Sequence, residues 1–357
     1  MSIAASFEIE YLQYLDESGK LLREDVPAFA RDVRALVEAY QWMCFTRIFD
    51  AKAIALQRTG KLGTYASCLG LEATYVAIGS ALAEDDVFAP FYRDYGAQFQ
   101  RGVKAREILL YWGGDERGND FSGAPHDFAW CVPIATQCLH AAGAALAFNI
   151  RKEPRVALAT VGDGGTSKGD FYAAINAGGA FALPLVVVVV NNQYAISIPR
   201  AQQTAAKTLA QKGIAAGIES IQVDGNDLVA MRVALDHAVK RARHGHGATL
   251  IEAVTYRLSD HTTADDARRY RSEDEVKAAW QKEPIKRLRA YLQGMNAWTD
   301  DKEKGWLAEC ASRIDAEIDA YLATQPPPVS AMFDYTYAEL PLDLERQRAD
   351  ALAAAKG

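Results

Sequence analysis

The sequence predicts an α/β fold in which a mostly parallel sheet carries helices on both of its faces. Residues 185–190 include five consecutive valines and no polar residue. A strand without polar alternation is typical of a parallel sheet buried on both sides. The apolar strand at 156–161 precedes a Gly-rich turn and a helix-compatible segment, which together give a βαβ pattern. Glycine-containing breaks at 213–217 and 225–227 separate further α/β units.

The N-terminal part of the chain is predicted to be mainly helical. Residues 1–27 are polar and mixed, which indicates an irregular N-terminal arm. Apolar residues recur at three- and four-residue steps through 28–60, so we expect an amphipathic helix there. A second helix is expected at 71–82 and a short strand at 87–91. The stretch 113–133 is rich in Gly, Asp and Pro and is predicted to be a long loop, which in a compact domain is often functional.

The rest of the chain alternates helices and strands before a charged helical end. An Ala-rich helix is predicted over 137–150, an apolar strand over 249–256 and helical structure over 272–322. A Pro-rich break follows the last helical stretch. We therefore expect an α/β domain at 28–324 and a C-terminal tail at 325–357, which lies on the surface or on a partner.

Composition and charge favour a cytoplasmic enzyme. The chain has 357 residues, of which 50% are hydrophobic, enough for a sizeable core. Its net charge of −7 argues against nucleic acid as the main partner. The five cysteines form no Cys-x-x-Cys pair, so neither a zinc site nor a disulfide framework is indicated. No secretory signal or apolar run of membrane-spanning length is recognised, so no membrane partner is expected.

Two polar residues follow neighbouring strands of the predicted sheet. Asp163 comes directly after the first strand and Asn192 after the valine-rich strand, with 28 residues between them. The carboxyl ends of parallel strands are where ligands bind in open α/β sheets. Both side chains offer hard oxygens suited to Mg²⁺ or Ca²⁺, and the N–H groups of Gly164 and Gly165 favour phosphate oxygens. The sequence therefore predicts a metal-bridged diphosphate site, against the simpler alternative of a structural turn and a strand-end cap.

Seven motifs extend the pattern over residues 28–322. In order they are GTYASCLGLEA, FYRDYG, PIATQ, GDGGTSKGDFYAAIN, NNQYAIS, QVDGND and YRLSDHTTADDARRYRS. The set resembles the alpha subunit of the thiamine-diphosphate-dependent, decarboxylating component of 2-oxo acid dehydrogenase complexes. The resemblance implies the thiamine-diphosphate-binding fold, with thiamine diphosphate and Mg²⁺ as cofactors. It also implies a beta subunit in an α₂β₂ heterotetramer, a lipoyl-bearing acyltransferase component and a 2-oxo acid substrate.

The same resemblance assigns roles to residues of this chain. It implies that the side chains of Asp163 and Asn192, and the backbone carbonyl of Tyr194, bind the metal. Residues implied to contact the cofactor are Tyr92, Arg93, Ile134, Asp163, Gly164, Gly165, Asn192, Arg257 and His261. Arginine suits this role because its guanidinium group can bind phosphate through two parallel hydrogen bonds.

His261 is the principal catalytic candidate. It lies in a polar, acidic stretch, so a packed core histidine is not expected. The alternative is a surface histidine in a mobile loop. The match to the family's loop implies that His261 helps transfer the acyl group to the lipoyl arm, a proton-transfer role suited to an imidazole. His126 is a second candidate for a functional histidine.

The acyl substrate is predicted to be pyruvate. The stretch QTAAKTLAQKGIAAGI resembles bacterial pyruvate-type subunits. Thr64 stands where relatives have a phenylalanine that narrows the acyl pocket, and Phe91 stands where a smaller or polar residue is more usual. The two changes either compensate for each other in volume or change the shape of the pocket. The alternatives are a branched-chain 2-oxo acid (2-oxoisovalerate) dehydrogenase and an acetoin dehydrogenase alpha subunit.

Enzymes of other classes fit less well. A transketolase or carboligase would use the same core but would carry its pyrimidine-binding glutamate domain in one longer chain. A NAD-dependent Rossmann enzyme would need a G-x-G-x-x-G turn after an early strand, and the sequence has none. A catalytically silent subunit is disfavoured because every metal and phosphate position is filled.

Overall fold

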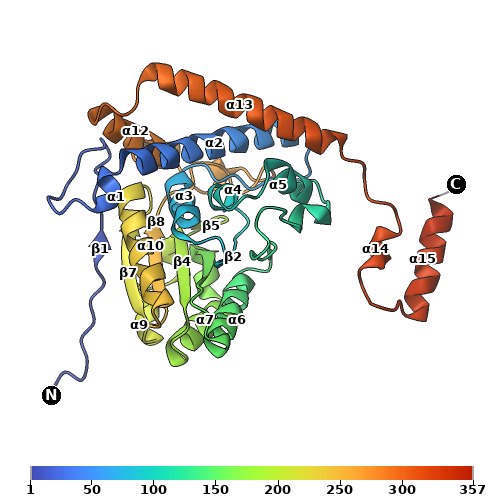
Figure 1. Ribbon diagram of the computed structural model, residues 1–357, viewed down its shortest axis with the longest axis horizontal. Coiled ribbons are helices and arrows are strands. Elements are labelled where there is room, and N and C mark those ends of the chain that lie inside the picture. The colour runs from blue at the N-terminus through green and yellow to red at the C-terminus, as the bar shows by residue number, and fades with distance from the viewer. Residues whose placement is uncertain (1, 356–357) are drawn as a thin grey trace.

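A computed structural model, which describes residues 2–355, contains a six-stranded sheet flanked by helices (Figure 1). The strand order is β1-β7-β8-β4-β3-β2, and every neighbouring pair runs parallel. The bounds of the strands in this sheet are β1 Tyr11–Leu12, β2 Val87–Ala89, β3 Ala157–Gly162, β4 Leu185–Asn191, β7 Glu219–Asp224 and β8 Thr249–Val254. A separate antiparallel hairpin consists of β5 Tyr194–Ala195 and β6 Ile198–Pro199. The predicted fold class, an α/β sheet of the thiamine-diphosphate-binding type, is confirmed.

The two faces of the sheet belong to two different hydrophobic cores. Along β4, Val186, Val188 and Val190 enter one core, whereas the alternating residues Leu185, Val187 and Val189 enter the other. Alternation places successive side chains on opposite faces of a strand, so both faces of β4 are covered. The valine run is buried because helices pack against it from both sides, as the sequence predicted.

The helices divide between these two cores. The larger core packs against α2 (Val33–Arg58), α3 (Glu72–Ala81), α5 (Ala105–Trp112), α10 (Leu228–Arg243), α12 (Pro284–Gly294) and α13 (Asp300–Ala323). The smaller core packs against α6 (Thr136–Arg151) and α7 (Gly169–Ala180). Shorter helices are α1 (Ala28–Arg31), α4 (Tyr95–Gln100), α8 (Arg200–Gln203), α9 (Lys212–Ala215) and α11 (Glu273–Trp280), with 3₁₀ turns at η1 (Glu116–Asn119), η2 (Asp163–Ser167) and η3 (Ala267–Arg269).

The predicted helix over residues 28–60 is interrupted. The backbone of Asp32 has φ −81° and ψ 88°, outside the helical region, so α1 and α2 are separate helices. The Asp32 carboxylate accepts a hydrogen bond from the backbone N–H of Ala35 at 3.1 Å and caps the start of α2. The prediction of one continuous helix was wrong because this capping bond favours a new helix start over continuation.

The N-terminal segment is more ordered than the sequence predicted. Tyr11 and Leu12 pair with β7 as an edge strand, and Tyr14 and Leu15 are buried. The Asp227 carboxylate accepts hydrogen bonds from the backbone N–H groups of Tyr14 and Leu15, both at 2.6 Å. The expectation of an irregular arm is therefore wrong for residues 11–15, because a distant carboxylate fixes them to the sheet.

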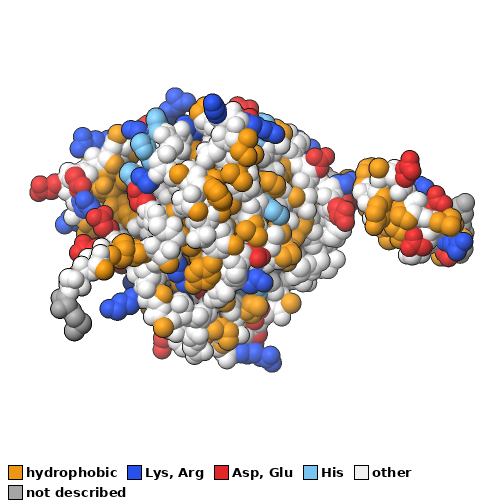
Figure 2. Space-filling view, turned by 90° about the horizontal axis from the view of Figure 1, so that it is seen from below, with side chains coloured by type: hydrophobic (Ala, Val, Ile, Leu, Met, Phe, Trp, Pro, Cys, Tyr) orange, Lys and Arg blue, Asp and Glu red, His pale blue; other side chains and the backbone are white. Residues whose placement is uncertain are grey.

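The C-terminal tail stands away from the body of the protein. After α13, the chain leaves the body and forms α14 (Ala331–Asp334) and α15 (Leu342–Ala354) at a distance from it (Figure 1). Figure 2 shows this lobe separated from the body, with hydrophobic side chains across its surface. Among its exposed residues are Met332, Tyr335 and Leu342. No helix within residues 2–355 has the length and apolar character needed to span a membrane.

Replacing a core leucine of β3 tests the burial of this strand in the larger core. Leu158 is fully buried, so Leu158→Ala is expected to lower the free energy of unfolding by about 2–5 kcal/mol through lost burial and a cavity. Leu342→Ala makes the same change in the tail, where the leucine is exposed, and should alter that free energy by less than about 0.5 kcal/mol. Urea unfolding of both variants measures the difference, and equal values would contradict the burial of β3.

Candidate active site

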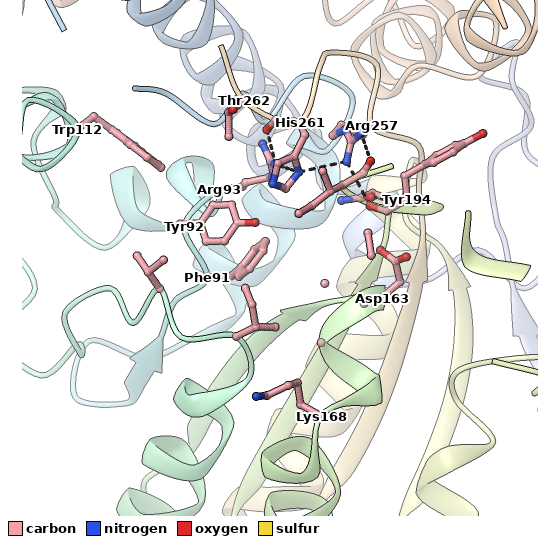
Figure 3. A pocket seen from close by; sticks show the side chains of 18 residues that line it. Phe91, Tyr92, Arg93, Trp112, Asp163, Lys168, Tyr194, Arg257, His261 and Thr262 are labelled. Carbon is pink, nitrogen blue, oxygen red and sulfur yellow. Dashed lines mark hydrogen bonds between the residues drawn. The ribbon is translucent and has the colours of Figure 1, made fainter. Parts of the chain in front are cut away.

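A cavity of about 580 Å³ lies at the carboxyl edge of the sheet (Figure 3). Strands β3 and β4 end there side by side, with Gly162 paired to Val190. All ten residues assigned to cofactor or metal from the sequence line it: Tyr92, Arg93, Ile134, Asp163, Gly164, Gly165, Asn192, Tyr194, Arg257 and His261. Residues far apart in the sequence are thus collected around one space of the size typical of cofactor sites.

Asp163 and Asn192 leave the strand ends as buried oxygen donors. Asp163 opens the η2 turn after β3, and Asn192 follows the last residue of β4. Both side chains are nearly inaccessible to solvent. Burial raises the pKa of Asp163, while a hydrogen bond from Gln203 Nε2 to Asp163 Oδ2, 2.9 Å long, acts in the opposite direction. The Asn192 Oδ1 atom accepts a hydrogen bond from the backbone N–H of Tyr194 at 3.3 Å.

The turn after Asp163 has room only for glycine. A Cβ atom at Gly164 would lie 2.5 Å from the Cβ of Ala195, and one at Gly165 would lie 2.4 Å from Cγ2 of Val161. Contacts this short are not tolerated, so neither position accepts a side chain without displacing its neighbours. The backbone of the turn can therefore approach a ligand closely, which is how glycine-rich turns bind phosphate groups.

Two guanidinium groups are buried beside this turn. Arg93 donates hydrogen bonds to the carbonyl oxygens of Ser67 and His261, both at 2.6 Å. Arg257 donates to the carbonyl oxygens of Ile196 at 2.9 Å and Tyr194 at 3.2 Å. Within residues 2–355 neither arginine forms an ion pair with a carboxylate. Burial lowers the pKa of Arg257, and the positive charge of Arg93 lowers it further. Two buried cations without an ion-paired carboxylate favour an anionic ligand, because a buried charge is stabilised by an opposite charge close to it.

His261 lies between the two arginines, and its proton position follows from its contacts. Arg93 Nη2 is 3.0 Å from His261 Nδ1, and Arg257 Nη1 is 3.4 Å from the same atom (Figure 3). Guanidinium groups only donate hydrogen bonds, so Nδ1 accepts and the neutral ring carries its proton on Nε2. Burial and the charges of Arg93 and Arg257 lower the pKa of His261 to about 3. His126, the second histidine candidate, is exposed and does not line the cavity.

The opposite part of the cavity is aromatic and apolar. The rings of Phe91 and Tyr92 have centroids 3.9 Å apart, and Trp112 meets Tyr92 edge to face at 6.4 Å. Ile134 also lines the cavity, and its side chain is partly exposed. Phe91 thus contributes to the wall, whereas Thr64 is exposed and lies outside the lining.

Two contributors were not found from the sequence. Trp112 ends helix α5 and reaches the cavity, and Gln203 contacts Asp163 from α8. Trp112 lies outside the quoted motifs, although the hydrophobic face of the helix that it ends could have indicated a buried aromatic there. Gln203 is the first residue of the stretch QTAAKTLAQKGIAAGI, but no role was predicted for it from the sequence.

The donor set suits a hard metal ion that shares a diphosphate. No group of three or more His, Cys, Asp or Glu side chains in the described part of the chain could hold a metal alone. Asp163, Asn192 and the Tyr194 carbonyl instead offer one carboxylate, one amide and one backbone oxygen. Mg²⁺ is commonly bound by one or two carboxylates together with phosphate oxygens. The glycine turn and the unpaired arginines provide for those phosphates, so the residues present fit both groups.

The fold and this site define a diphosphate-binding α/β enzyme. The family model for the dehydrogenase E1 component matches residues 40–330, and the chain belongs to that family. This membership confirms the resemblance drawn from the motifs and implies thiamine diphosphate as cofactor.

Curated relatives cover nearly the whole chain. One is the pyruvate dehydrogenase E1 component subunit alpha of Staphylococcus aureus (strain Mu50), 40% identical over 342 residues, which are 95% of this chain and 92% of the relative. Its namesake from Staphylococcus epidermidis (strain RP62A) has the same identity and coverage.

The ionisation of His261 gives a direct test of the site's electrostatics. The pKa of His261 is about 3 in the folded chain, against 6.5 for an ordinary histidine in the unfolded chain. As the pH falls below 6.5, the unfolded chain therefore binds the proton first. The contribution of the neutral imidazole to the free energy of unfolding is complete above pH 6.5 and is lost as the pH falls toward 3. Histidine NMR of the isolated chain, assigned with His261→Gln, should show a neutral ring down to about pH 5. Inorganic pyrophosphate should raise that pKa by offsetting the arginine charges. Titration near 6.5 in the free chain would contradict the arrangement.

Proposed function

We propose that this chain is the alpha subunit of a pyruvate dehydrogenase E1 component. It catalyses the oxidative decarboxylation of pyruvate and the transfer of the acyl group to a lipoyl domain. The observation that carries the proposal is the cavity in which Asp163 and Asn192 face two buried arginines without carboxylate partners. The relatives at 40% identity, which carry this activity in their names, support the choice of reaction.

The cofactor site is assigned residue by residue. The side chains of Asp163 and Asn192 and the carbonyl of Tyr194 would hold Mg²⁺. The residues that would bind the diphosphate are Tyr92, Arg93, Gly164, Gly165 and Arg257. Ile134 would contact the aminopyrimidine ring. When bound, thiamine diphosphate supplies the nucleophilic carbon and the electron sink that decarboxylation of a 2-oxo acid requires.

His261 is proposed as the proton donor in acyl transfer. The lipoyl disulfide opens when one sulfur takes the acyl group, and the other sulfur then needs a proton. In the free chain Nδ1 accepts from Arg93 and Arg257, and the neutral ring carries its proton on Nε2. The ring would donate a proton to the lipoyl sulfur only from its imidazolium form, which returns to the neutral ring when the proton leaves. The diphosphate would offset both arginine charges, so cofactor binding would raise the pKa of His261 toward the range useful for proton transfer.

The aromatic wall supports a small acyl group. Phe91 and Tyr92 pack with ring centroids 3.9 Å apart, and Trp112 closes the same part of the cavity. A bulky residue at position 91 takes space that a branched acyl chain would need, which favours pyruvate over 2-oxoisovalerate. No residue that lines the cavity favours an acetoin dehydrogenase over a pyruvate dehydrogenase.

Partner subunits are needed to complete this site. Membership of the family as an alpha subunit implies a beta subunit and further components of a complex. We propose an α₂β₂ heterotetramer that delivers acyl groups to a lipoyl-bearing acyltransferase in the cytoplasm. The exposed apolar side chains of Val132 and Ile134 beside the cavity support a partner surface at this position. The projecting tail after residue 324 is a second segment suited to a partner.

The activity can be tested with a panel of 2-oxo acids. The chain and its beta subunit, with thiamine diphosphate, Mg²⁺ and an artificial electron acceptor, are expected to give the highest kcat/KM with pyruvate. The isolated chain should show no turnover, because it contributes only part of the site. Preference for a branched substrate would replace pyruvate in the proposal, and full turnover by the isolated chain would overturn the two-subunit assignment.

The role of His261 can be separated from decarboxylation. His261→Ala is expected to reduce transfer to a lipoyl domain by about 10²–10⁴-fold, the usual contribution of a proton-transfer group. Decarboxylation measured with the artificial acceptor should fall less. His126→Ala is the control, since His126 is exposed outside the cavity. Equal losses in both assays would place His261 in the decarboxylation step instead.

A further inference from the structure

The segment after Asn192 folds back over the glycine turn. Strands β5 and β6 form a hairpin, and the short helix α8 follows it directly. Ala195 in the hairpin is the residue whose Cβ would lie 2.5 Å from a Cβ at Gly164, so the hairpin covers the turn at close range. The last residue of α8, Gln203, then returns to Asp163. The segment therefore begins next to Asn192 and ends with Gln203, which contacts Asp163, and both Asn192 and Asp163 are candidate metal ligands.

Gln203 contacts the site through its side-chain amide. Its Nε2 donates to Asp163 Oδ2 at 2.9 Å and to the Ile198 carbonyl oxygen at 3.4 Å. Its Oε1 lies 3.2 Å from the position of a Cβ at Gly164, so the amide sits against the turn. Gln203 does not line the cavity, so any effect it has on a ligand there acts through its neighbours.

An amide is a distinctive donor at this position. A buried carboxylate needs hydrogen-bond donors, and Asp163 is almost completely buried. A lysine or arginine would satisfy the carboxylate but would also neutralise it and repel a cation. The uncharged amide of Gln203 fixes the orientation of the carboxylate while leaving its full negative charge available. Hydrogen bonds to the ligands of a metal are known to tune metal affinity in this way.

We propose that Gln203 is a positioning residue of the metal site, whose amide orients the Asp163 carboxylate and fastens residues 194–203 over the glycine turn. This inference rests on the proposed function, because it requires Asp163 to bind the metal. It adds a residue to which the sequence assigned no role, and it assigns the hairpin and α8 a part in cofactor retention.

The test measures binding by the assembled enzyme, with Mn²⁺ as the probe. Electron paramagnetic resonance gives the Kd of Mn²⁺, and calorimetry gives the Kd of thiamine diphosphate. Gln203→Met keeps the length of the side chain but removes the donor, and Gln203→Ala removes both. Both variants are expected to weaken Mn²⁺ binding by about 10- to 100-fold, the usual cost of losing a hydrogen bond to a metal ligand. Gln202→Ala is the matched control, because Gln202 is exposed on the same helix and should bind Mn²⁺ normally.

Asp163→Ala separates this inference from the proposed function. If Asp163→Ala loses Mn²⁺ affinity while Gln203→Met stays within about twofold of the wild type, only the role of Gln203 is refuted. Wild-type affinity in Asp163→Ala would remove the metal assignment and the inference together. A loss in Gln203→Ala that Gln203→Met does not share would assign the effect to packing, and it would overturn the hydrogen-bond role. Equal melting temperatures of the metal-free variants establish that their folds are comparable.

Discussion

The positions of the active-site residues depend on the register of β3, β4 and β8. Successive side chains of β4 enter two different packed cores. A shift of β4 by one residue against its neighbours would move each side chain into the opposite core, and the packing of both cores excludes such a shift. With that register, Gly162 pairs with Val190 and Asn191 pairs with Val254. Asp163 and Asn192 must therefore emerge at the same edge, and the chain after β8 delivers Arg257 and His261 to it. Core packing thus sets the geometry of a site that contains almost no core residues.

The cavity combines two environments with different tasks. Oxygen donors and cationic groups gather around the glycine turn, where the backbone can approach a charged ligand. Aromatic rings of Phe91, Tyr92 and Trp112 form the other part, where an acyl group can be held away from water. His261 lies between them, with its ring 6.5 Å from Tyr92 and its Nδ1 bonded to Arg93. The imidazole that we propose as proton donor therefore lies where the polar and apolar parts meet.

Much of this arrangement could be predicted because the strongest signals are local. The valine run and the residues that follow the strands identify the sheet and its ligand-binding edge, and all assigned residues line one cavity. Asp32 could not be foreseen as a break, since a single polar residue within a periodic helix is usually tolerated. The pairing of Tyr11 with β7 depends on Asp227, which is remote in sequence, and two residues are too few for a strand pattern. Gln203 reaches Asp163 only because of the hairpin path, which no periodicity encodes.

The pair of buried arginines also bears on the stability of the protein without its cofactor. Because Arg93 and Arg257 are buried without carboxylate partners, a bound anion is expected to stabilise the fold. Exchanging either arginine for a neutral residue would also remove the donors to the backbone carbonyl oxygens of Ser67 and His261, or of Tyr194 and Ile196, so the pair supports the local backbone as well as an anionic ligand.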